Sequence, residues 1–165
     1  MKSCIMANKR LLGIGDQPEF LLTMKQWLLS TYSECQFDMA FRYEEGRQLI
    51  LLLTYDLVIC DILSAPGLEL AGLIKDRKLP VLALMDHSTS RDILHHFKGV
   101  KIRSVLPKQD INIIAPAVEK ILKSEASPGW TRVGKTLCGL PNFLISSLAT
   151  PGPERSFHID KTNLY

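Results

Sequence analysis

The sequence predicts an α/β fold in which five parallel strands form one doubly wound sheet, a (βα)5 arrangement. Three observations predict it. Short apolar runs alternate with segments of helical periodicity between residues 11 and 123, in the order βαβαβαβαβα. The runs at 57–60 and 80–85 are apolar without alternation, which is typical of strands covered on both faces. The length of 165 residues suffices for one such domain and an appendage.

The first half of the chain supplies two strand–helix units. A short apolar run stops at a Gly-Asp pair, and Pro18 follows, a residue that the first turn of a helix tolerates. From Phe20 to Leu28 the apolar residues recur at helical spacing. The expected elements are a strand at 11–14, a helix that starts near Pro18, a strand at 35–41 and a helix at 44–54.

The second half supplies three more units. One helix is expected to begin with Ser88 or Ser90 as its cap and to end at Gly99, because these residue types are typical of the two helix ends. Pro116 is expected inside the last helix, where proline is unfavourable. Strands are expected at 56–60, 80–85 and 102–107, and helices at 67–76, 88–99 and 111–123.

The composition changes after residue 123. The stretch SEASPG predicts a linker, and the apolar residues of 130–149 have the three- or four-residue spacing of an amphipathic helix, interrupted by a glycine and a proline. This tail is too short for a helix-turn-helix domain. It either contacts a partner or packs back on its own domain. The expected organisation is a domain at 1–123, a linker at 124–129 and a helical or irregular extension at 130–165.

Composition and charge limit the classes of function. Apolar residues make up 46% of the chain and charged residues 22%, as in soluble globular proteins. The net charge of +3 is small and has no dense Lys/Arg cluster, so no nucleic-acid partner is expected. No apolar run approaches the roughly 20 residues of a membrane span. The four cysteines form no C-x-x-C pair, which disfavours a zinc site or a disulfide framework and favours a reduced, cytoplasmic protein.

Charged residues follow four of the predicted strands at one edge of the sheet, and Asp86 is the one after the fourth strand. Sites in such sheets lie outside the carboxyl ends of the strands, where Asp16, Asp61 and Lys108 are expected. Paired carboxylates suit Mg²⁺, a lysine can neutralise a phosphoryl oxygen, and Asp61 can act as a nucleophile that forms an aspartyl phosphate. The alternative is structural. Asp61 then caps the loop that contains Pro66 and Gly67 and forms an ion pair with Lys108.

Residues 9–123 resemble the receiver domain of bacterial two-component response regulators, a CheY-like, flavodoxin-like fold. DLVICDIL resembles the phosphoacceptor strand, PVLALM the fourth strand and VLPK the end of the fifth. The resemblance implies Asp61 as phosphoacceptor, Lys108 as the phosphate-contacting lysine, and Asp16, Asp61 and the Leu63 carbonyl as ligands of Mg²⁺. It also implies a histidine kinase or phosphotransfer protein as donor. The output is then a surface read by a protein partner or a second copy, and not enzymatic turnover of a metabolite.

The sequence departs from the receiver pattern at four positions. Gly15 replaces the first of two consecutive acids, Met85 the usual Thr or Ser, Val105 the aromatic switch residue, and Gln109 the usual proline. The loop after Asp61 is also one residue longer. We therefore expect weak Mg²⁺ binding and loss of the usual switch. The leading hypothesis is a stand-alone receiver, and the alternative is a pseudo-receiver that binds partners without phosphorylation.

Other candidates near the site are weaker. Asp86 and His87 are adjacent polar residues after a strand and favour a loop over a metal site. Ser88 or Thr89 is an alternative source of the hydroxyl that Met85 lacks. A doubly wound nucleotide-binding enzyme is disfavoured, because GIGDQP lacks the G-x-G-x-x-G spacing.

Overall fold

The strands of the computed structural model, which describes residues 6–86 and 91–126, form a single parallel sheet. The strand order is β2-β1-β3-β4-β5, so the predicted fold class is confirmed. All pairs run parallel because each strand is followed by a segment that returns the chain to the same edge. The strands are β1 (Arg10–Ile14), β2 (Gln36–Ala40), β3 (Leu57–Asp61), β4 (Pro80–Met85) and β5 (Lys101–Pro107).

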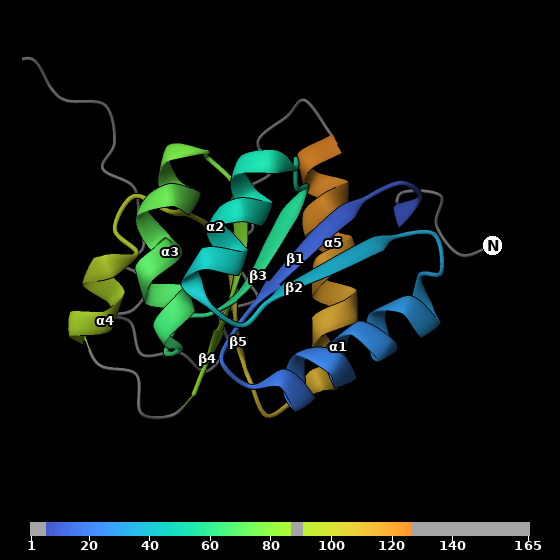
Figure 1. The fold of residues 1–165 in the computed structure, drawn as a ribbon. Coiled ribbons are helices and arrows are strands. Elements are labelled where there is room, and N and C mark those ends of the chain that lie inside the picture. The colour runs from blue at the N-terminus through green and yellow to red at the C-terminus, as the bar shows by residue number, and fades with distance from the viewer. Residues whose placement is uncertain (1–5, 87–90, 127–165) are drawn as a thin grey trace, which may run out of the picture.

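Helices cover both faces of the sheet (Figure 1). One face carries α1 (Pro18–Thr31) and α5 (Ile114–Ala126), and the other carries α2 (Tyr43–Leu52), α3 (Ala65–Asp76) and α4 (Arg91–His96). A short 3-10 turn, η2 (Ile111–Ile113), precedes α5. Among the helices that the structure describes, none has the length and apolar character that crossing a membrane requires.

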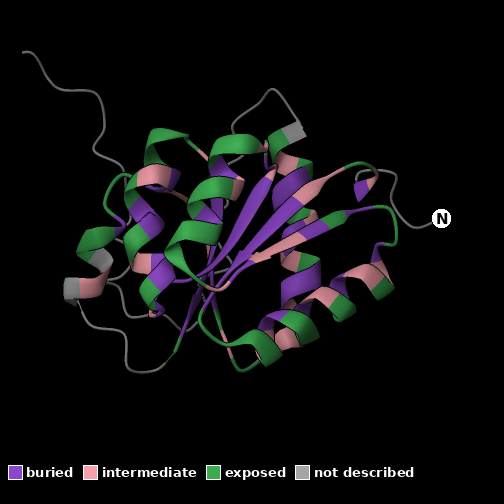
Figure 2. Ribbon diagram, in the orientation of Figure 1, coloured by how far each residue is buried: buried purple, intermediate pink, exposed green. Residues whose placement is uncertain are grey.

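The core consists of two apolar layers separated by the sheet. Along β4, Val81, Ala83 and Met85 belong to the layer under α2 and α3, whereas Leu82 and Leu84 belong to the layer under α1 and α5. Successive side chains of a strand point to opposite faces, so a strand covered on both faces must be apolar throughout. Figure 2 shows the buried strands between helices whose outer sides are exposed.

Two helix starts differ from the prediction, and both involve proline. Pro66 was expected in the loop and the helix was expected to begin at Gly67, but both residues lie in the first turn of α3, where Ser64 is the N-cap. Pro116 was expected in a helix interior, but α5 begins only at Ile114, so Pro116 lies in its first turn. Proline lacks a backbone N–H, and the first-turn N–H groups have no intrahelical partner, so both positions cost no hydrogen bond.

Two helix ends also differ from the prediction. The helix expected at 88–99 is observed at 91–96, and the turn that follows contains Gly99 at a φ of 84°, a conformation that favours glycine. The expected caps at 88 and 90 lie outside the described residues. Helix α5 continues to Ala126 and thus enters the segment expected to be a linker. The predicted extension at 130–165 also lies outside the described part of the chain.

Tyr32, at the end of α1, contacts α5 through a hydrogen bond to Glu119. This contact should make the stability of the folded protein depend on pH in the alkaline range. The Tyr32 hydroxyl donates a hydrogen bond of 2.6 Å to Glu119, and burial, reinforced by that bond, raises the pKa of Tyr32 to about 12. The folded state thus holds the phenolic proton more tightly than the unfolded state. The associated stability is complete below pH 10 and is lost as the pH rises towards about 12.

We therefore expect Tyr32→Phe to flatten the alkaline decline of the free energy of unfolding. Urea denaturation between pH 8 and roughly pH 11 measures this dependence. Tyr43→Phe is the matched control, because Tyr43 is exposed. An equally steep decline in Tyr32→Phe and in the wild type would refute this role of the Tyr32 hydroxyl.

Candidate functional site

Asp61 and Lys108 meet at the carboxyl edge of the sheet, as the strand ends predict. Asp61 is the last residue of β3 and is only 3% exposed. Lys108 follows β5, and its backbone N–H donates to the Met85 carbonyl at the end of β4. The ammonium of Lys108 forms an ion pair and a hydrogen bond with Oδ2 of Asp61. The parallel strands thus join two charged groups that are 47 positions apart in the chain.

The loop after β3 wraps around Asp61. The Leu63 N–H donates to Oδ1 of Asp61 at 3.1 Å, so both carboxylate oxygens accept a hydrogen bond. The Ser64 hydroxyl donates to the Asp61 carbonyl at 2.7 Å and accepts from the Gly67 N–H at 3.1 Å. One side chain therefore caps α3 and fixes the backbone of Asp61. Sequence reasoning missed the capping role of Ser64, although a serine before a helical segment is a typical N-cap.

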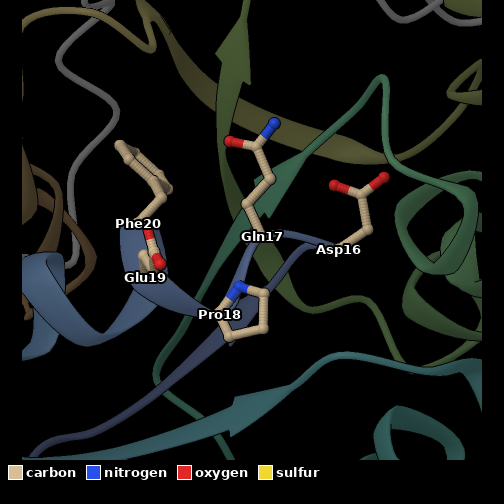
Figure 3. A pocket seen from close by; sticks show the side chains of 5 residues that line it. All are labelled: Asp16, Gln17, Pro18, Glu19 and Phe20. Carbon is tan, nitrogen blue, oxygen red and sulfur yellow. The ribbon is translucent and has the colours of Figure 1, made fainter.

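Asp16 lies on the neighbouring loop after β1. It is exposed and lines an open hollow of about 500 Å³ together with residues 17–20. Figure 3 shows the side chains of Asp16, Gln17 and Phe20 extending to the same side of this loop. Within the described residues, no hydrogen bond or ion pair engages the Asp16 carboxylate.

Gly15 leaves space where a second acid would stand. A Cβ built on Gly15 would lie 3.4 Å from the Cβ of Asp61, an ordinary van der Waals contact. A side chain at this position would therefore start beside the phosphoacceptor candidate. Glycine at position 15 removes a carboxylate from the immediate surroundings of Asp61.

The possible metal ligands near Asp61 are oxygen atoms, which magnesium prefers, but they are few. Across residues 6–86 and 91–126, no group of three or more His, Cys, Asp or Glu side chains is placed to hold a metal. Asp16, Asp61 and the Leu63 carbonyl supply oxygen, which Mg²⁺ prefers, and Mg²⁺ commonly keeps several waters. The Lys108 ammonium already neutralises Asp61. The residues thus match magnesium only in the chemistry of their oxygen donors, and Lys108 already occupies one of the carboxylates.

The two positions at which the resemblance to receiver domains predicts switch residues are packed into the core. Met85 and Val105 are each 6% exposed and belong to the apolar layer under α2 and α3, together with Phe97. Neither side chain offers a hydroxyl, and Val105 has no ring to rotate. The geometry therefore provides no polar connection from Asp61 through these two side chains.

A polar contact joins the loops that follow β4 and β5. The side-chain amide of Gln109 donates to the Asp86 carboxylate at 2.5 Å, and both residues are exposed. Asp86 thus lies in a loop, as expected. The neighbouring candidates at 87–89 lie outside the described residues. His95 and His96 are exposed at the end of α4.

Comparisons with known proteins identify the fold. No family model and no curated protein matches the sequence. A CheY-like receiver domain from Methanospirillum hungatei is 16% identical, with a TM-score of 0.62, and the match covers 74% of this chain and 100% of that chain. A two-component response regulator from Clostridium difficile is 19% identical, with a TM-score of 0.60 and coverages of 73% and 100%.

A third similar structure is the N-terminal domain of a response regulator/sensory box/GGDEF protein from Carboxydothermus hydrogenoformans. It is 20% identical, with a TM-score of 0.60, and the match covers 71% of this chain and 96% of that chain. The chain therefore has a flavodoxin-like, doubly wound α/β fold. Within that class, its fold is that of the response-regulator receiver domain.

Proposed function

We propose that this chain is a receiver-type signalling module in which Asp61 accepts a phosphoryl group from a histidine kinase or phosphotransfer protein. The observation that carries the proposal is the buried Asp61–Lys108 ion pair at the carboxyl edge of a receiver fold. A carboxylate there can act as a nucleophile, and the adjacent ammonium can neutralise a phosphoryl oxygen. The output would be a surface read by a downstream protein or a second copy of the chain.

The transfer exchanges one bond to phosphorus for another. A carboxylate oxygen of Asp61 attacks the phosphorus of a phosphohistidine, the P–N bond breaks, and the imidazole leaves with its electron pair and takes up a proton. The attacking oxygen must give up its hydrogen bond from Lys108 or Leu63. Lys108 then moves its charge to a phosphoryl oxygen. Mg²⁺, if held by Asp16, Asp61 and the Leu63 carbonyl, would supply further positive charge to the phosphoryl oxygens.

Labelling with a small acyl phosphate and Mg²⁺ tests this proposal. We expect slow uptake of one phosphoryl group, measured by intact mass, and complete loss of uptake in Asp61→Asn. Asp86→Asn is the matched control, because Asp86 is an exposed carboxylate after the adjacent strand β4. It should label like the wild type. Uptake that survives in Asp61→Asn would move the chemistry to another residue.

Gly15→Asp is expected to strengthen Mg²⁺ binding by about tenfold, because ligand charge strongly affects the affinity for hard cations. The Cβ of the new side chain would start beside Asp61 at an ordinary van der Waals distance. Isothermal calorimetry measures the Kd. Gly72→Asp, at an exposed position of α3 with open space around it, is the control and should leave the Kd unchanged. Sub-micromolar binding by the wild type would refute our description of the site.

A second candidate is a pseudo-receiver that binds partners without phosphorylation. Two observations favour it: the apolar packing of Met85 and Val105, and the glycine at position 15. The two candidates differ in one result. A chain that takes up no phosphoryl group from any donor, yet binds its partner equally well with Asp61→Asn, is a pseudo-receiver.

A further inference from the structure

The ring of Phe20 lies beneath the ammonium of Lys108. Phe20 is in the first turn of α1, and its ring centroid is 5.2 Å from Nζ of Lys108. The same ammonium pairs with Asp61. Two elements that are distant in sequence therefore contact this one cation. One is the carboxyl end of β3, and the other is the start of α1.

The contact is favourable on general electrostatic grounds. The face of an aromatic ring carries partial negative charge and attracts a cation within about 6 Å of its centroid. The attraction grows when the cation is partly removed from water, and the Lys108 side chain is only 16% exposed. A lysine has a flexible four-carbon stem, so a second contact restricts where its ammonium can lie.

We propose that Phe20 is a positioning residue that holds the Lys108 ammonium against Asp61 before a phosphoryl group arrives. This inference deepens the proposed function, and the effect of Phe20 on the rate of phosphoryl uptake rests on that function. A charge that is already held close to Asp61 has only a short distance to move when phosphoryl charge develops there, so less reorganisation is needed. The contact also links α1 to the site. Movement of the ammonium from Asp61 towards a phosphoryl oxygen would change its position over the ring.

Two substitutions at Phe20 separate ring electrostatics from packing. Phe20→Leu keeps an apolar side chain but removes the ring face, and Phe20→Tyr keeps the ring. Ring currents shift protons above an aromatic face upfield in NMR spectra. We expect upfield-shifted ε-methylene protons of Lys108 in the wild type and in Phe20→Tyr, and loss of this shift in Phe20→Leu. Phosphoryl uptake should be about three- to tenfold slower in Phe20→Leu and unchanged in Phe20→Tyr.

Phe41→Leu is the matched control, because Phe41 also packs against the layer under α1 and α5. It should change neither the Lys108 signals nor the rate of uptake. Lys108 protons without an upfield shift in the wild type would overturn the inference. Phosphoryl uptake that is slowed equally in Phe20→Leu and in Phe20→Tyr would also overturn it. If the wild type takes up no phosphoryl group, the proposed function fails, and the Lys108 shift alone decides whether Phe20 holds the ammonium.

Discussion

Replacing Gly67 with alanine is expected to lower the free energy of unfolding by about 3 kcal/mol. A Cβ at this position would lie 2.2 Å from the backbone oxygen of Asp61, 2.9 Å from the Ser64 hydroxyl and 3.1 Å from the Cys60 sulfur. Backbone atoms cannot move aside as a side-chain end can. Relief of the overlap must therefore displace the end of β3 or break the cap that Ser64 provides to α3.

Gly72 offers a matched control on the same helix. A Cβ at Gly72 meets no atom within 4 Å, so Gly72→Ala should raise stability by up to about 1 kcal/mol through helix propensity. Urea denaturation of both variants measures the two effects. A Gly67→Ala variant as stable as the wild type would show that the α3 cap is not packed against Asp61 as described.

Replacing Lys108 with methionine is expected to cost about 3 kcal/mol of stability at neutral pH. The Asp61 side chain is 5% exposed, and the Lys108 ammonium is its only cationic partner within the described residues. Removal of that partner leaves a buried carboxylate with a single hydrogen bond from the Leu63 N–H. An uncompensated buried charge is much more costly than loss of the pair as a whole.

The double variant Asp61→Asn/Lys108→Met tests the cause of that loss. If the unpaired charge is responsible, Asp61→Asn should restore most of the stability that Lys108→Met removes, and the two effects should be strongly non-additive. Simple addition of the two losses would contradict the buried ion pair. Lys123→Met on the exposed side of α5 should have little effect, because an exposed ion pair such as the one with Glu119 contributes little.

The buried elements of the fold could be predicted because their residues carry a strong pattern. The fourth strand was predicted at 80–85 and is observed at those residues, since both faces of β4 must be apolar. The meeting of Asp61 and Lys108 also followed from strand ends alone, because parallel strands finish at one edge.

The rest could not be predicted because it depends on local geometry. Pro66 is a typical turn residue, and only the hydrogen bonds of Ser64 show that it lies in the first turn of a helix. The contact of Phe20 with Lys108 needs the start of α1 to lie close to the residue that follows β5, and no sequence periodicity specifies this proximity. The magnesium ligands and phosphorylation of Asp61 remain predictions.

The central claim is that Asp61 accepts a phosphoryl group without operating a switch through β4 and β5. Amide NMR spectra of the full chain, before and after loading with a small acyl phosphate, test it most directly. We expect chemical-shift changes at 15–20, at 61–64 and at Lys108, with little change at Val105 and along α4. Large changes that extend from Met85 through Val105 to α4 would contradict the claim, as would the absence of any change around Asp61.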